Sequence, residues 1–264
     1  MRQNTIILFF LFLTGFVHKG KAEESTLNRD SVLYKKSWSV GVRLRSDGFA
    51  LGTEITRSKR FKRSWLVQAQ FAYFWHPKQV KQQSQYGSGG GLFGTDGFKP
   101  FIYGKQNSLF TLYLGAGQKF LLAEKGRGHG VQLFFKYAGG FTLAILKPYL
   151  LEVVDTASIS GNTFSNTVTL GYEPNNPNSL FLERDYIVGA AGFGKGWSLK
   201  AQPGIHVEVA MEFDFGKNES FIKELEVGVA SDFYFKKVPV MVQSNKILYP
   251  SVFVGIQLGK RKER

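Results

Sequence analysis

Alternating apolar and polar residues are the strongest pattern in this chain, and the longest run covers residues 198–215. Apolar side chains occupy its odd positions from Leu199 to Phe215, while Lys200 and Glu208 lie among the even positions. A strand points successive side chains to opposite faces, so the run predicts a β-strand with one apolar and one polar face. Its length exceeds the roughly five or six residues typical of globular strands and suits a tilted strand that crosses a membrane.

Seven further segments alternate in the same way. They cover residues 38–45, 49–55, 65–75, 110–120, 131–145, 224–235 and 248–259. The pair Asp47 and Gly48 between the first two predicts a hairpin turn. We therefore predict an all-β fold, an up-and-down transmembrane antiparallel β-barrel with eight strands and long extracellular loops. A hairpin through residues 150–154 and 186–191 would raise the number to ten, and both numbers stay open from the sequence alone.

The lengths of the connections predict the orientation of the barrel. An even number of strands places both termini on one side, which is the periplasmic side in outer-membrane barrels. Short connections at residues 56–63, 123–129 and 217–220 alternate with long ones at residues 76–107 and 147–197. Aromatic residues near the strand ends predict two membrane girdles, Trp38, Phe61, Trp65, Phe120 and Phe215 at the inner side and Tyr73, Trp75, Tyr149, Trp197 and Phe235 at the outer.

The N-terminal segment predicts export. Arg2 precedes an apolar run at residues 6–17, and a short polar stretch follows it up to Ala22. This order is typical of a secretory signal peptide, which we assign to residues 1–22, and the run is too short for a spanning helix. The remaining residues, 23–264, contain no Pro/Ser/Gly-rich linker and are predicted to form one barrel domain.

Composition excludes some classes of protein. The chain has no cysteine, so it forms no disulfide and carries no lipid-modified cysteine. Its net charge is +14, and many basic residues fall on the predicted periplasmic side: Arg57, Lys59, Arg60, Lys62, Arg63, Lys125, Arg127, Lys260, Arg261, Lys262 and Arg264. We expect no nucleic-acid partner in that compartment. Anionic lipid head groups are one interpretation of these residues, and a solvated rim is the other.

The polar strand faces predict a lumen filled with charge. An eight-stranded barrel is just wide enough to hold its own side chains, so these residues are expected to neutralise one another instead of lining a pore. A proton or ion pathway would use the same residue types. The predicted network consists of Arg43, Arg45, Lys119, Lys136, Lys200, His206, Glu208, Glu212, Asp214, Glu224 and Glu226.

Catalytic residues are scarce. After the signal peptide the only histidines are His76, His129 and His206, and no serine lies where His206 and Glu208 would activate it. We predict a non-enzymatic protein of the outer membrane with no catalytic, cofactor-binding or metal-binding residue. Its expected partners are outer-membrane lipid and an envelope protein or ligand bound by the extracellular loops. A porin-like barrel that transports small or hydrophobic solutes is the alternative function, followed by a lipid-modifying enzyme.

Four short motifs occur in a fixed order along the chain: SVGVRLRSDG at residues 39–48, HPK at 76–78, YGKQNSL at 103–109 and LKPYL at 146–150. Together they resemble a family of uncharacterised outer-membrane β-barrel proteins of Bacteroidota-type bacteria. The resemblance covers most of the mature chain and implies location and fold, not an activity. The chain ends on basic residues instead of the terminal aromatic residue usual in proteobacterial barrels.

Overall fold

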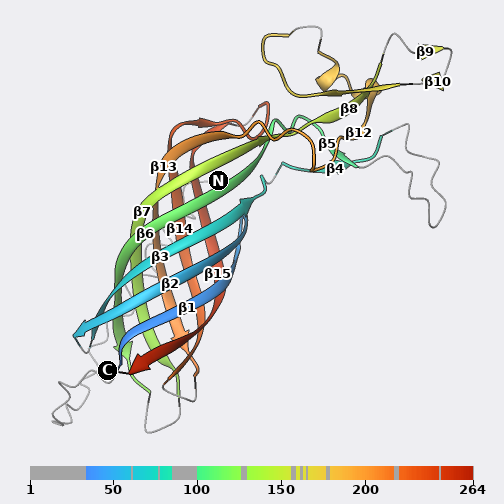
Figure 1. The fold of residues 1–264 in the computed structure, drawn as a ribbon. Coiled ribbons are helices and arrows are strands. Elements are labelled where there is room, and N and C mark those ends of the chain that lie inside the picture. Colours follow the sequence, from blue (N-terminus) through green and yellow to red (C-terminus); the bar gives the residue numbers. More distant parts are fainter. Residues whose placement is uncertain are drawn as a thin grey trace, which may run out of the picture. The chain divides into compact units, whose positions relative to one another are not determined.

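The computed structural model describes residues 34–60, 62–76, 78–84, 100–125, 130–155, 159–160, 163–164, 166–176, 179–216, 220–243 and 245–263. Eight long antiparallel strands form a closed barrel in the order β1-β15-β14-β13-β7-β6-β3-β2 (Figure 1). The strands are β1 Tyr34–Arg45, β2 Gly48–Arg60, β3 Arg63–Phe74, β6 Asn107–Ala123, β7 Gln132–Pro148, β13 Lys200–Asp214, β14 Phe221–Val238 and β15 Lys246–Glu263. The predicted eight-stranded barrel is therefore confirmed, whereas the predicted signal peptide lies outside the described residues.

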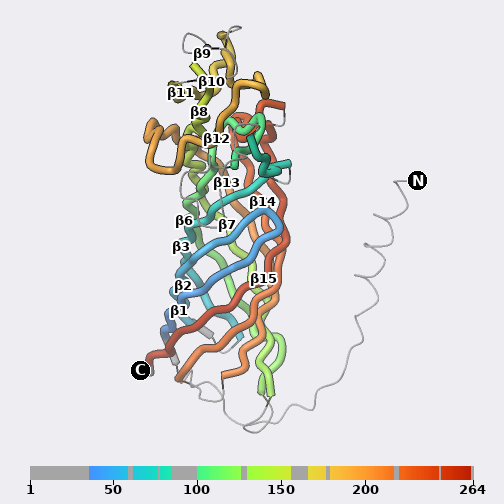
Figure 2. Tube along the Cα trace, turned by 90° about the vertical axis from the view of Figure 1, so that its right-hand side faces the viewer, coloured from blue at the N-terminus to red at the C-terminus, as the bar shows by residue number. Residues whose placement is uncertain are grey.

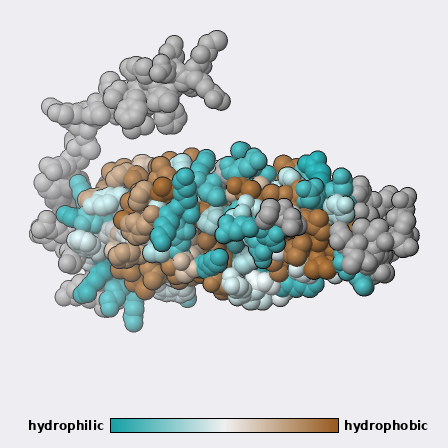
Figure 3. Space-filling model, turned by 90° about the horizontal axis from the view of Figure 1, so that it is seen from above, coloured by the Kyte–Doolittle hydropathy of each residue, from teal (hydrophilic) through white to brown (hydrophobic). Residues whose placement is uncertain are grey.

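The apolar strand faces form the outer wall of the barrel, and the polar faces point inward. Val42 and Ile256 are 57% and 60% exposed on this wall, whereas Glu208 and Lys136 are buried inside. Hydrophobic side chains occupy broad areas of the face in Figure 3. The strands are tilted, as Figure 2 shows, and tilt is what closing a sheet into a barrel requires. None of the helices in the described ranges is long and apolar enough to cross a membrane.

The predicted hairpin between β1 and β2 is present, but its turn residues are Ser46 and Asp47 instead of Asp47 and Gly48, because Gly48 pairs with Arg45 as the first residue of β2. Gly48 has a φ of 153°. A Cβ atom at this position would lie 2.0 Å from the carbonyl oxygen of Tyr73 in the neighbouring strand β3. Only glycine fits this position without moving the backbone of β3.

The proposed extra hairpin exists, but it is not part of the barrel. Strand β8 (Leu151–Val154) pairs with both β12 (Ile187–Ala190) and β11 (Thr167–Leu170) in a separate sheet of three strands. The ten-stranded alternative is therefore wrong. Two further small sheets lie in the long connections, β4 (Lys81–Gln82) with β5 (Phe101–Ile102), and β9 (Ile159–Ser160) with β10 (Thr163–Phe164).

The long connections build a hydrophobic core of their own. Phe101, Leu151, Val153, Phe181 and Ile187 are buried together beneath the sheet of β8, β11 and β12. The short 3-10 helix η2 (Leu180–Leu182) contributes Leu180 and Phe181 to this core, and a second one, η3 (Arg184–Tyr186), leads into β12. We call the assembly of β4, β5, β8, β11, β12, η2 and η3 the outer module. It is an ordered structure, and the end of the barrel beside it is called the outer end.

A pair of engineered cysteines tests closure of the barrel between its first and last strands. Val42 of β1 lies opposite Ile256 of β15, and such neighbours are about 5.5 Å apart between Cα atoms, within the range that a disulfide spans. Because the chain has no cysteine of its own, Val42→Cys with Ile256→Cys should give one disulfide with copper phenanthroline, seen as a shift in gel mobility. Val42→Cys with Val252→Cys, four residues out of register, should not. Equal oxidation of both pairs would contradict the register.

Candidate functional site

The barrel lumen contains the largest group of buried charges. Ten of the eleven residues predicted to lie there are buried, namely Arg43, Arg45, Lys119, Lys136, His206, Glu208, Glu212, Asp214, Glu224 and Glu226. Lys200 is the exception and a correction: it is exposed. It is the first residue of β13, at the outer end, where β13 extends past Gly204, the first of its residues that pairs with β14.

Lys136 of β7 lies at the centre of the lumen network. Its side chain is fully buried, with Nζ 2.5 Å from Glu226 Oε1, 2.8 Å from Glu212 Oε1 and 3.1 Å from Glu54 Oε2. A fourth carboxylate, Glu208, is 3.6 Å away. Burying an isolated charge is costly, so one ammonium group surrounded by carboxylates is the arrangement that makes these charges tolerable.

Arg43 of β1 joins two of the same carboxylates from the other side. Its Nε donates to Glu226 Oε2 and its Nη1 to Glu208 Oε2, both at 2.8 Å. The guanidinium carbon also lies 4.8 Å from the ring centroid of Phe253. Gln68 of β3 donates to Glu208 Oε1 at 2.7 Å. Hydrogen bonds from charged and neutral donors thus hold both acids in fixed positions.

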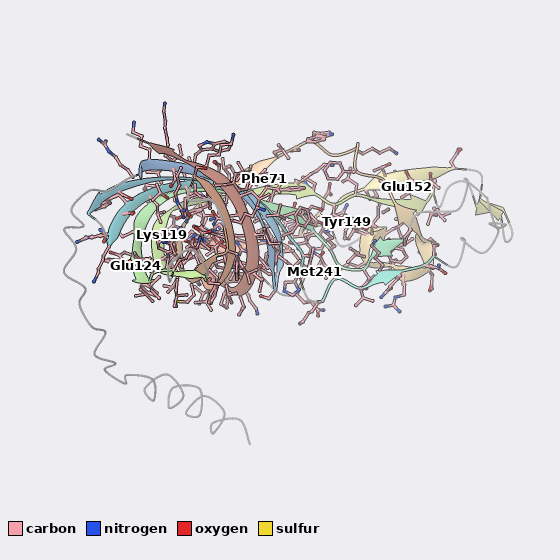
Figure 4. The ribbon with its side chains drawn as sticks, turned by 90° about the horizontal axis from the view of Figure 1, so that it is seen from below. Phe71, Lys119, Glu124, Tyr149, Glu152 and Met241 are labelled. Atoms are coloured by element: carbon pink, nitrogen blue, oxygen red, sulfur yellow. The ribbon has the colours of Figure 1, made fainter. Side chains whose placement is uncertain are left out.

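Lys119 of β6 extends the network toward the end of the barrel where β1 begins and β15 finishes. Its Nζ is 2.9 Å from Glu224 Oε1 and also contacts Glu212, which therefore bridges Lys119 and Lys136. Figure 4 shows Lys119 within the barrel. Beyond Lys119, Nη2 of Arg261 lies 2.5 Å from Oδ2 of Asp214. The ion pairs follow one another along most of the lumen.

His206 lies nearer the outer end, between two carboxylates. Its Nδ1 is 2.7 Å from Asp232 Oδ1, and its Nε2 is 3.3 Å from Glu208 Oε2. Arg45 pairs with Asp232 at 3.0 Å and with Asp47 at 2.8 Å. Both ring nitrogens of His206 therefore face acids. No described serine, threonine or tyrosine hydroxyl makes a hydrogen bond to this imidazole, so the geometry required of a nucleophile and its base is missing.

The network includes acids that the sequence analysis did not select. Glu54 on β2, Asp47 at the first hairpin and Asp232 on β14 are all buried and paired. Glu54 follows the alternation of β2, since Ala50 is buried while Leu51 and Ile55 are exposed. Glu54 lies on the inward face of the predicted segment at residues 49–55, and listing the polar residues of that face would have found it.

The lumen is filled by these side chains. Two voids lie among them, one lined by Arg43, Glu54 and Gln70 and the other by Arg45, Asp47 and Tyr234, and each measures about 10 Å³. A void of this size holds roughly one water molecule. The described residues offer no group of three or more histidine, aspartate or glutamate side chains arranged to hold a metal ion.

A second cluster lies where the barrel meets the outer module, and Figure 4 places Tyr149 and Met241 there. Tyr149 was predicted in the outer girdle, but its hydroxyl accepts a hydrogen bond from Ile102 N at 3.0 Å and its ring packs against the outer-module core. Lys105 is only 3% exposed, with its Nζ 5.1 Å from the centroid of the Tyr149 ring. Burial lowers the pKa of Lys105 to about 8.

Exposed aromatic residues continue from this cluster onto the outer rim. The Nζ atom of Lys147 lies 3.7 Å from the ring centroid of Phe193 and 4.6 Å from that of Trp197, and it donates to the carbonyl of Phe193. Phe193 and Trp197 are themselves mostly exposed. Trp197, Trp75 and Phe235 thus lie on the outside as the predicted outer girdle requires.

A closed barrel with an apolar outer wall and a charged, filled lumen defines this chain as an integral transmembrane β-barrel, the architecture of bacterial outer membranes. No protein-family model matches the chain. No curated protein sequence is significantly similar to it either.

Similar solved structures are eight-stranded barrels of low sequence identity. Neisserial surface protein A is 8% identical with a TM-score of 0.40, covering 87% of this chain and 97% of its own. Ail, the attachment invasion locus protein of Yersinia pestis, is 9% identical with a TM-score of 0.38, covering 87% and 99%. The N-terminal barrel of Pseudomonas aeruginosa OprF is 7% identical with a TM-score of 0.35, covering 87% and 98%. The resemblance to a Bacteroidota-type family stays a prediction.

Removing the central cation tests the lumen network. Lys136→Met leaves the carboxylates of Glu54, Glu212 and Glu226 without their shared partner, and should lower the free energy of unfolding by about 3 kcal/mol or more in urea titrations of the folded barrel. Adding Glu212→Gln should restore part of the loss. Lys195→Met removes an exposed ion pair with Glu152 and should change stability by less than about 1 kcal/mol. Equal urea midpoints for all variants would contradict a paired network.

The buried Lys105 predicts a pH dependence. Its folded pKa of about 8 lies below the ordinary value of 10.5, so between these pH values the unfolded chain holds a proton that the folded chain lacks. The free energy of unfolding should therefore rise from pH 8 to 10.5, by on the order of 1–3 kcal/mol, and stay at its lower level below pH 8. Urea titrations of Lys105→Met should lack this rise, while Lys195→Met keeps it. A rise of the same size in Lys105→Met would assign it to another group.

Proposed function

We propose that this protein is a non-enzymatic barrel of the bacterial outer membrane that binds a partner through its outer module. In this proposal the chain termini lie in the periplasm and the outer module lies outside the cell. The partner is an envelope protein or an external ligand with an extended polypeptide segment. The observation that carries the proposal is the buried core of the outer module, because a surface held in a fixed shape by its own core is suited to specific binding.

The filled lumen supports a binding function over transport. Lys136, Arg43 and Lys119 are each held by at least two carboxylates, and two voids between lumen side chains are only about 10 Å³ each. A solute would have to displace several buried ion pairs to pass. We therefore do not propose the transport alternative.

The lumen also offers no support for the lipid-modifying alternative. His206 and Glu208 do contact each other, as a catalytic pair would, but Glu208 is shared with Arg43 and Gln68. The second ring nitrogen of His206 faces Asp232. Among the described residues this histidine is an element of the charge network, with no nucleophile beside it.

Strand β11 is the part of the outer module best suited to bind an extended segment. It is an edge strand, paired among the described residues with β8 alone. Its residues Thr167, Val168 and Thr169 are exposed. An edge strand offers free backbone donors and acceptors to which another strand adds, which is a recurring mode of peptide recognition.

The register identifies the residues that face the free edge. Asp155 N donates to Asn166 O, so Asn166 and Asp155 form a hydrogen-bonded pair, and pairs of this kind recur at every second residue of an antiparallel ladder. Val168 therefore bonds to Val153 of β8. The backbone groups of Thr167 and Thr169 point away from β8, toward the free edge.

A proline at the free edge tests the proposal. Thr169→Pro removes the free N–H group without removing a donor to β8, and proline is tolerated on edge strands. A photoreactive phenylalanine analogue at Val168 should cross-link a partner of defined mass in intact cells. Thr169→Pro should reduce this adduct about tenfold, from the loss of one backbone hydrogen bond and the clash of the ring with an added strand.

Thr169→Ala is the matched control, because it removes the same hydroxyl and keeps the N–H group. It should retain the adduct. An adduct that persists in Thr169→Pro would show that the partner binds elsewhere on the module. The absence of a protein adduct from Val168, Val80 and Leu182 alike, all exposed positions near the outer end, would overturn the binding function.

A further inference from the structure

Figure 1 shows the end of the barrel where β15 finishes, and the outer wall at this end carries exposed basic residues. On each of five adjacent strands, β3, β2, β1, β15 and β14, a basic outward residue lies at this end of the strand, next to the apolar outward residues. These exposed residues are Arg63, Arg57, Lys36, Lys260, Lys262 and Lys223, and we call them the basic belt. They point to the outside of the wall, unlike the buried lysines and arginines of the lumen.

The register places several of these cations side by side. Arg57 lies opposite Lys36, and Lys36 lies opposite Lys262, so three positive residues form one row across β2, β1 and β15. Residues directly opposite each other in a sheet have Cβ atoms about 5 Å apart, and like charges in such pairs are destabilising. This row needs a counter-charge from outside the strands that form it.

The belt follows the plane of a membrane surface. In a barrel of tilted strands, a row of directly paired residues changes its depth in the membrane from one strand to the next. A ring of residues at constant depth must therefore step to another row as it passes around the barrel. The belt does so: Lys260 is one row above Lys262, opposite Phe221, and Lys223 is one row higher again, opposite Leu258. The cations therefore stay at one depth, directly below the apolar wall.

Along the remaining three strands, the described outward residues include no such cation. At the same end, the apolar outward residues on or beside β6, β7 and β13 that are exposed or half-exposed are Phe120, Leu122, Val131, Leu133 and Phe215, while Lys125, in the turn after β6, is half-exposed and its Nζ donates to the carbonyl of Gly216. The basic belt therefore covers one side of the barrel. A rim that only aids solubility has no reason to be basic on five adjacent strands and apolar on the other three.

The aromatic neighbours of the belt favour a ligand that is both anionic and apolar. The guanidinium carbon of Arg63 lies 5.9 Å from the centroid of the Trp65 ring and 5.7 Å from that of Phe120. Trp38, next to Lys36 along the outer face of β1, is 52% exposed. Tryptophan at the edge of an apolar wall is typical of the membrane interface. Among the described residues, no carboxylate forms an ion pair with a member of the belt.

We propose that the basic belt binds the phosphate head groups of anionic phospholipids in the adjoining leaflet, with their acyl chains against the wall of β3, β2, β1, β15 and β14. The phosphates supply the counter-charge that the row of Arg57, Lys36 and Lys262 lacks. A lipid satisfies both the cations and the apolar wall above them, whereas a free anion satisfies only the cations.

Lipid selectivity of the intact barrel tests this proposal. The wild-type protein is incorporated into nanodiscs of equal phosphatidylcholine and phosphatidylglycerol, released, and analysed by native mass spectrometry for retained lipid. The variant K36Q/R57Q/K262Q should lose about tenfold or more in its preference for phosphatidylglycerol. The control K200Q/K236Q/K237Q neutralises three exposed lysines at the outer end and should keep the wild-type preference.

A charge-conserving variant, K36R/R57K/K262R, guards against a defect in folding and should also keep the preference. Heat-modifiable gel migration checks that each barrel is folded. Equal preference in the wild type and K36Q/R57Q/K262Q would overturn the proposal, as would an equal loss in the outer-end control. Displacement of the retained lipid by excess inorganic phosphate would show a site for free anions and would overturn it as well.

Discussion

Buried carboxylates need cations, and this requirement connects every strand of the barrel. Lys136 is the centre of the arrangement, because Glu54, Glu212 and Glu226 all approach one ammonium group that has no access to solvent. The network takes members from all eight barrel strands: Arg43, Glu54, Gln68, Lys119, Lys136, Glu208, Glu226 and Gln257. The polar half of the alternation thus specifies a closed barrel as firmly as the apolar half, since opening the wall would expose these charges to lipid.

The sequence predicted the barrel because a single physical rule governs its strands. Lipid on one side and packed charge on the other force a period of two, and that period is readable without homologues. The rule also has clear limits. Lys200 obeys the alternation but lies past the rim of the barrel. It was wrongly predicted to be buried because an alternating pattern does not mark where the closed barrel wall ends. Glu54 obeys it too, yet it lies in a strand whose outward face is interrupted by Thr53, which makes the pattern weaker there.

The pairing of the charges and the form of the outer module were not predictable in the same way. Which acid meets Arg43 depends on the stagger of strands across the lumen, and alternation within one strand carries no information about it. The outer-module core joins Phe101, Leu151 and Phe181, which are far apart in the chain and belong to strands and 3-10 helices too short to show a period. The basic belt was not predictable either, because the strand register decides which of its residues lie side by side.

The long separation between lumen partners constrains how the chain assembles. Arg43 lies on the first strand, and its partners Glu208 and Glu226 follow 165 and 183 residues later. Strands that entered the bilayer one after another would carry an uncompensated guanidinium into hydrocarbon until the last third of the chain arrived. We therefore expect insertion to be concerted with closure, at a rate governed by the search for contacts between distant parts of the chain. The same ion pairs that fill the finished barrel are thus expected to make its folding slow and all-or-none.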